Sequence, residues 1–321
     1  MNYQLQENLI ATIREKIPKG KNMTAYLSEK LILSRESVYR RLRGEINFTF
    51  EEIAALSLDL GFSLDNIIGI KKNENALFNI HILQDSDYLD VYINKMLEYG
   101  KMFRKISKQP NTIAHMAINM MPYLFIIKYK NLSRFRIYKL MYQNQKIGSN
   151  DTFSDFLLPE KIAEAHKAFD EDTLTIPEFT LIMDDNVFWS ATKDIEYFIK
   201  RGLLTANDVH ALQAELYYMV DMLEQMATSG VNSSGRKTSI YISSIDIEAS
   251  NLHIESDDFR FSQIRIFSTS AIDSYNETLC NMQKEWIESL KKYSVLISKS
   301  GEIQRFEYLK KQREYINKIT P

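Results

Sequence analysis

The segment Ser34–Gly44, SRESVYRRLRG, carries a start signal and a stop signal for one short helix. Ser34 is a good N-cap, because its hydroxyl can accept a hydrogen bond from a backbone N–H that the first turn leaves free. Glu36 places negative charge in that turn, and Gly44 stands where a left-handed C-cap belongs. The spacing predicts a helix over residues 34–43.

The two faces of this helix differ in chemistry. Val38 and Leu42 lie four residues apart, so they share one face, on which both can be buried. Arg35, Glu36 and Arg40 then point to the opposite side. We therefore expect the helix to be packed on one side and charged on the other.

The residues before this segment predict two further helices. Thr24 can cap a short helix, AYLSEKL, which ends at a tight apolar turn formed by Ile32 and Leu33. An earlier helix, terminated by Pro18 and Gly20, carries a stripe of apolar residues four positions apart. That stripe consists of Leu5, Leu9, Ile13 and Ile17.

Two more helices are predicted after Gly44. Thr49, with Glu52 three residues later, forms a capping box for the helix EEIAALSLDL, which Gly61 ends. Ser63 then opens a short helix through residues 66–68. Residues 1–70 are therefore expected to form five short helices, the second and third of which make a helix-turn-helix.

This order and spacing resemble the lambda-repressor-like helix-turn-helix family, of the Cro/C1 or Xre type, over Gln4–Gly69. The resemblance implies a five-helix domain that binds double-stranded DNA, with the 34–43 helix in the major groove. Matched residue by residue, it implies base contacts by Arg35, Glu36 and Arg40, and phosphate contacts by Thr24 and Arg43.

Two positions depart from the family's pattern. Ile32 replaces the usual turn glycine, which implies a turn without a left-handed residue, because a β-branched side chain is strained in that conformation. Arg41 stands where an apolar residue is usual, which leaves Leu42 to carry the packing.

The charge of the N-terminal region is nearly balanced. Residues 1–72 contain 11 Lys and Arg against 9 Asp and Glu, and the remainder contains 29 against 33. Basic helices are commonly only solvated faces, so phosphate contacts must come from a local patch. The patch comprises Lys19, Lys21, Arg35, Arg40, Arg41 and Arg43, with Lys19 and Lys21 as further phosphate contacts.

Composition narrows the class of protein. The chain has 321 residues, of which 45% are hydrophobic, enough for a sizeable core in two or more domains. The single cysteine, Cys280, excludes an intramolecular disulfide and a multi-cysteine zinc site, and fits a reducing cytoplasm. No signal peptide is visible, and the most apolar stretch, residues 116–127, is too short to span a membrane.

The chain divides at a polar segment. We expect a DNA-binding domain at 1–70, a linker at 71–77 and a C-terminal domain at 78–321. Periodicity and capping signals predict C-terminal helices at 87–105, 112–127, 132–142, 159–172, 186–201, 206–228, 274–297 and 302–319. Thr205 and Asp208 are expected to cap the helix at 206–228. Three alternating segments predict an antiparallel meander, at 238–247, 252–255 and 259–267. The expected fold class is mainly α: a five-helix domain, then a larger helix-dominated α+β domain with a small antiparallel sheet.

Signatures of catalysis are nearly lacking in the sequence. The five histidines lie far apart, without the paired spacing of a metal site. Residues 229–239, SGVNSSGRKTS, only imitate a phosphate-binding loop, because Arg236 interrupts the Gly-Lys step and a helix precedes the segment. We therefore expect no enzyme activity, no metal and no cofactor. The 18 tyrosines and 17 phenylalanines fit either a core or an apolar pocket for a small-molecule effector.

These features predict a cytoplasmic, sequence-specific transcription regulator that binds a DNA palindrome as a homodimer, its C-terminal domain serving oligomerisation or ligand sensing. Three alternatives stay open. An adaptor that uses the helix-turn-helix for protein contacts would tie up Arg35, Arg40 and Arg43 in internal ion pairs. An enzyme would show a deep pocket with shifted pKa values, and a nucleoid-type binder would show no preferred DNA site.

Overall fold

The computed structural model of the chain describes residues 2–18, 20–62, 64, 67, 78–81, 88–173, 175–267 and 270–321. The chain forms two compact units, Met1–Leu77 and Phe78–Pro321. Each unit has a hydrophobic core of its own.

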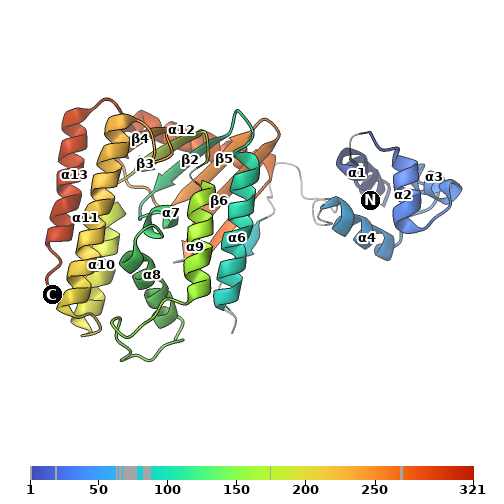
Figure 1. Cartoon of the computed structure of the whole chain (residues 1–321). Helices are drawn as coiled ribbons and strands as arrows, with labels where there is room; N and C mark the ends of the chain where they lie inside the picture. The colour runs from blue at the N-terminus through green and yellow to red at the C-terminus, as the bar shows by residue number, and fades with distance from the viewer. Residues whose placement is uncertain are drawn as a thin grey trace. The chain divides into compact units, whose positions relative to one another are not determined.

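The first unit is built from four described helices, drawn in blue in Figure 1. They are α1 (Asn2–Lys16), α2 (Met23–Leu31), α3 (Arg35–Leu42) and α4 (Phe50–Leu60). Each contributes apolar side chains to one core, including the fully buried Ile13, Leu27, Val38 and Leu56. Most of the fifth helix expected at 63–68, and the whole linker expected at 71–77, lie outside the described residues.

The start signals of these helices are confirmed in two of three cases. The Ser34 hydroxyl accepts from the Ser37 N–H at 3.2 Å, and Thr49 forms its capping box with Glu52. The cap expected from Thr24 is wrong. Asn22 caps α2 instead, with its side-chain oxygen accepting from the Ala25 N–H at 3.1 Å.

The turn between α2 and α3 contradicts the expectation for Ile32. This residue adopts the left-handed conformation, with φ 54° and ψ 43°, and its N–H donates to the Ser28 carbonyl. Only Ile32, Leu33 and Ser34 separate the two helices, so the turn geometry prevails over the preference of a β-branched side chain. The Ile32 side chain is 92% exposed.

The second unit is organised by an eight-stranded mixed sheet, which corrects the expected fold class. The strand order is β1 (Asn79–His81), β7 (Ser270–Ser274), β6 (Phe259–Phe267), β5 (Asn251–Ser256), β2 (Ile113–Ile118), β3 (Glu178–Met183), β4 (Lys237–Ser243) and β8 (Ser294–Leu296). Strands β2, β3 and β4 are parallel, and the other pairs are antiparallel. The predicted meander is confirmed for its second and third segments, which form the antiparallel pair β5 and β6. Its first segment is misplaced, because β4 pairs with β3 and β8 instead of β5.

The central strands explain this error. Residues 112–127, expected to form one kinked helix, contain β2 and a short helix, α7 (Tyr123–Ile126). Parallel central strands are covered on both faces, so their residues form a continuous apolar run without alternation. Such a run cannot be told from a buried helix by its periodicity.

Helices cover both faces of the sheet (Figure 1). Alternate residues of β2 and β3 divide between them: Met116 and Leu181 face one side, Ala117 and Ile182 the other. The second side packs on α12 (Glu277–Leu290) through Ile287. Helix α12 and β8 together replace the single helix expected at 274–297. The first side packs on α6 (Tyr88–Ile106), α8 (Lys130–Gln143), α9 (Glu160–Thr173), α10 (Asn186–Lys200), α11 (Ala206–Ser229) and α13 (Glu302–Asn317).

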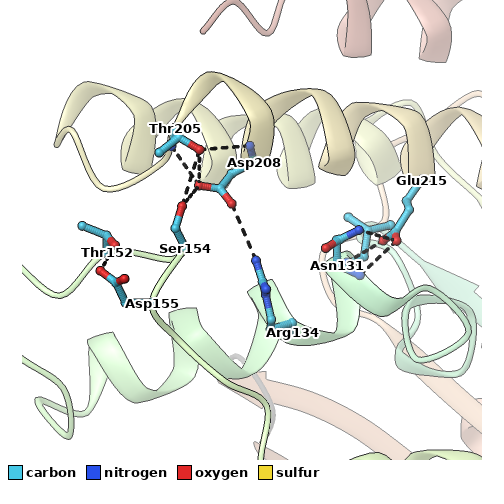
Figure 2. Close-up of polar contacts among 9 residues, drawn as sticks. Asn131, Arg134, Thr152, Ser154, Asp155, Thr205, Asp208 and Glu215 are labelled. Carbon is cyan, nitrogen blue, oxygen red and sulfur yellow. Dashed lines mark hydrogen bonds and ion pairs between the residues drawn. The ribbon is translucent and has the colours of Figure 1, made fainter.

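Helix α11 fixes its neighbours by polar contacts at its N-terminal half (Figure 2). The predicted capping box of Thr205 and Asp208 is confirmed. Asp208 also accepts from the Ser154 hydroxyl at 2.6 Å and pairs with Arg134 of α8 at 3.6 Å. Further along α11, Glu215 accepts from the first backbone N–H groups of α8 and so caps that helix from outside.

Candidate nucleic-acid interface

Packing fixes α3 on the first unit through its inner face. Val38 is fully buried among apolar residues of α1, α2 and α4. At the C-terminal end of α3, the Gln6 amide of α1 donates to the carbonyls of Arg41 and Ile46, at 3.3 and 3.2 Å. The orientation of α3 is therefore set by both an apolar and a polar contact.

Arg41 belongs to this internal framework and not to the outward basic patch. Its Nε and Nη2 atoms donate to the two carboxylate oxygens of Glu52, at 2.9 and 2.8 Å. Its Nη1 donates to the Ser37 carbonyl at 3.2 Å. The side chains of Arg41 and Glu52 are only 11% and 14% exposed. This pairing explains how an arginine can occupy a half-buried position on the inner side of α3.

The outer face of α3 carries four exposed residues, Arg35, Glu36, Tyr39 and Arg40. Residues four apart in a helix are neighbours, so Arg35 lies beside Tyr39 and Glu36 beside Arg40. The predicted base-reading residues thus share one surface. Tyr39 was missed, although its position one turn after Arg35 places it on the same face.

Ion pairs cross this surface. Glu45, just after α3, pairs with Arg40 at 3.4 Å and with Arg43 at 3.0 Å, and Glu36 pairs with Arg43 at 3.6 Å. Among the residues that the structure describes, Arg35 forms no ion pair. About half or more of each paired side chain is exposed. Exposed pairs contribute about 0–1 kcal/mol, so a phosphate or a base can replace them at little cost.

The phosphate positions expected around α2 differ in exposure. Thr24 is only 8% exposed and lies within the first turn of the helix. Lys21 is exposed, with its ammonium 5.3 Å from the centre of the Tyr26 ring. Lys19 lies outside the described residues. Exposed Asn22, which caps α2, is a further polar group at this helix start that the sequence reading missed.

The described side chains offer no alternative metal centre. No group of three or more His, Cys, Asp or Glu residues in the described part is arranged to hold a metal ion. Within the same ranges, no helix combines the length and the apolar character that crossing a membrane requires.

Comparisons with known proteins return no match. No family model, no curated protein and no solved structure matches this chain. The surface of α3 and the packing behind it are therefore the features from which a function can be inferred.

Proposed function

We propose that this chain is a sequence-specific, DNA-binding transcription regulator that inserts α3 into the major groove. The observation that carries the proposal is the division of α3 into a fixed back and a charged front. Val38 is fully buried, whereas Arg35, Glu36 and Arg40 are exposed together. The resemblance of Gln4–Gly69 to the lambda-repressor-like family supports the same use of this helix.

The chemistry of the exposed side chains suits base edges. The guanidinium of Arg35 or Arg40 can donate two hydrogen bonds to guanine O6 and N7, and Glu36 can accept from a cytosine amino group. The ring of Tyr39 can pack against a thymine methyl group. Arg43 and Lys21 flank these residues and can bind phosphates, which fixes the register of α3 on the duplex.

A single unit of this size contacts few base pairs, so we infer that two copies bind a palindrome as a homodimer. The larger unit would then serve assembly or the binding of a small effector. We assign this activity to the cytoplasm.

The experiment is selection of full-length protein on a random pool of duplex DNA at one fixed salt concentration. We expect a palindromic motif whose half-sites lie about 10 base pairs, or a multiple of that, apart. Retention of all sequences alike would instead indicate a nucleoid-type binder. Failure to retain DNA at low salt would contradict DNA binding altogether.

A second candidate function is contact with another protein through the helix-turn-helix. The observation that favours it is that Glu45 pairs with Arg40 and Arg43, two of the arginines that DNA binding would need. Glu45→Gln separates the two functions. If α3 reads DNA, removing this negative charge should strengthen DNA binding several-fold, because the carboxylate opposes phosphates. Glu29→Gln, on the exposed surface of α2, is the matched control. An unchanged or weaker affinity for DNA in Glu45→Gln would favour the protein-contact function.

The buried His166 of the second unit does not support an enzymatic role for that unit. Burial lowers the pKa of His166 to about 4, so the ring is neutral near pH 7. Its Nε2 bonds to the Tyr92 hydroxyl at 2.9 Å, and its Nδ1 bonds to the Ser133 hydroxyl at 2.8 Å. Because both ring nitrogens are occupied by the protein, neither is available to a substrate.

A further inference from the structure

The second unit contains a cavity of about 190 Å³ beneath helix α6. Its walls come from helices α6, α7, α8 and α9 on one side and from strands β2, β5, β6 and β7 on the other. The cavity is therefore formed entirely within one compact unit.

Most of the cavity wall is apolar. The side chains of Tyr92, Met96 and Phe103 line it from α6, Ile118 from β2 and Phe169 from α9. A wall of this kind favours a ligand that is itself mostly apolar, because such a ligand leaves water without burying polar groups that lack hydrogen-bond partners.

The charges at this cavity are all positive. Among the described residues that line it, the charged ones are Lys95, Arg136 and Arg265, and the other polar ones are neutral. Lys95 pairs with the exposed Glu98 at 2.6 Å, and Glu98 does not line the cavity. The buried Asp273 accepts from the Tyr99 hydroxyl at 3.2 Å and is also absent from the wall.

Arg136 of α8 is a cation of the cavity wall that lies over one of the aromatic rings in the same wall. Its guanidinium carbon lies 4.8 Å from the centre of the Tyr123 ring, which also lines the cavity. Burial lowers the pKa of Arg136 to about 10, so it stays positively charged at neutral pH.

The hydrogen bonds behind the wall hold the aromatic rings in place. The hydroxyls of Tyr92 and Tyr123 both bond to His166 Nε2. Since the neutral His166 is fixed by Ser133 from its other side, neither tyrosine side chain can swing out of the wall without breaking its hydrogen bond to His166. The cavity is thus preorganised, which lowers the entropic cost of binding.

We propose that this cavity binds a compact apolar carboxylate, with its anionic end at Arg136 and its aryl or branched alkyl group between α6 and the sheet. The size suits one ring with a short chain, since an engineered cavity of about 150 Å³ binds benzene. An arginine on an aromatic ring can still donate two parallel hydrogen bonds to a carboxylate. The proposal does not depend on DNA binding.

The test uses the full chain and three isosteric probes that differ in charge: 3-phenylpropanoate, 3-phenylpropan-1-ol and 3-phenylpropan-1-amine. Isothermal titration calorimetry should give a Kd of about 10 µM to 1 mM for the acid, the range for ligands of this size. The alcohol and the amine should bind at least about tenfold more weakly, because they lack the charge-assisted hydrogen bonds. Equal binding of acid and amine, or no binding of the acid at several millimolar, would overturn the proposal.

Two variants locate the site. Arg136→Gln should remove the preference for the acid over the alcohol, and Ala271→Phe should fill the cavity and abolish the binding of both. Lys193→Gln, an exposed lysine of α10, is the control and should leave all three affinities unchanged. Circular dichroism checks that each variant is folded. Unchanged binding of the acid by folded Ala271→Phe would place the site elsewhere and refute the proposal.

Discussion

Arg41 of α3 and Glu52 of α4 form a two-point ion pair, and the same carboxylate caps α4 by accepting from the Thr49 N–H at 3.0 Å. One acid thus fixes both the start of α4 and the C-terminal half of α3. Because both side chains are mostly buried, the pair is screened little by solvent.

Arg41→Met should lower the stability of the first unit by about 1–3 kcal/mol, since it leaves a poorly solvated carboxylate without its cation. In scanning calorimetry of the full chain, a unit of this size should lose several degrees, at about 4–8 °C per kcal/mol. The exposed Arg43→Met is the control and should change stability by less than about 0.5 kcal/mol. Equal effects of the two substitutions would mean that the ion pair of Arg41 with Glu52 does not contribute measurably to the stability of the first unit.

Base reading and phosphate binding should separate between Arg40 and Arg43. Arg40→Ala is expected to weaken specific DNA binding by about 1–3 kcal/mol and to relax the preference at one base pair per half-site. Arg43→Ala should weaken all sequences alike and lower the salt slope by about one. Both are measured by titration on selected and scrambled duplexes. An unchanged selected motif for Arg40→Ala would remove this residue from the base-reading set.

Ile32→Gly should stabilise the first unit by about 0.5–1.5 kcal/mol. The left-handed conformation costs a side chain about 1–2 kcal/mol, and the greater freedom of glycine in the unfolded chain offsets part of this gain. The exposed side chain loses little packing when it is removed. Ile32→Val keeps the β-branch and should leave the thermal midpoint unchanged. A lower midpoint for the glycine variant would show that the turn carries no strain.

The stability of the second unit should fall as the pH drops from about 6.5 towards 4. Burial lowers the pKa of both His166 and His253 to about 4, against 6.5 for an unperturbed histidine. Between these values the unfolded chain binds protons that the native chain excludes, so acid favours unfolding, by up to about 2–3 kcal/mol per histidine. Urea denaturation followed by tryptophan fluorescence at several pH values measures this slope.

A matched pair of histidine variants assigns the effect. His166→Gln should reduce the pH dependence of the unfolding free energy by about one proton between pH 6.5 and 4. His210→Gln, at an exposed position of α11, should leave it as in the parent chain. The same slope in both variants would exclude His166 as a source.

The fragment 1–77 should fold alone but bind a palindrome more weakly than the full chain. It has its own core and capped helices. If the larger unit joins two copies, the second half-site contact becomes intramolecular, which can strengthen binding by about 10² to 10⁴. Titration of both proteins on intact and half operators measures this. Equal affinities on the intact palindrome would rule out the larger unit as the dimerisation element.

Local signals were the most informative part of the sequence. The boxes of Thr49 with Glu52 and of Thr205 with Asp208 are confirmed, because each depends on residues three positions apart. Thr24 is not the cap because Asn22, two residues earlier, also has a side-chain oxygen that can accept a hydrogen bond, and it accepts the one from the Ala25 N–H. On α3, the exposure of Arg35, Glu36 and Arg40 follows from helical periodicity alone.

Long-range pairing was not predictable in the same way. The partner of Arg41 is eleven residues away on another helix, and nothing in the α3 sequence specifies it. Strands β2 and β3 escaped detection because their burial on both faces removes the alternation by which strands are recognised. The cavity beneath α6 combines residues of helices α6 to α9 with residues of strands β2, β5, β6 and β7, which lie far apart in the sequence, so only the fold brings them together.

The described sheet ends at both sides in strands of three residues, β1 and β8. Short outer strands expose few unpaired backbone groups, which is one way in which natural proteins discourage edge-to-edge pairing with strands of another chain and the aggregation that follows. If two copies of this chain associate, these short outer strands favour contact through side-chain surfaces over pairing of the two sheets edge to edge.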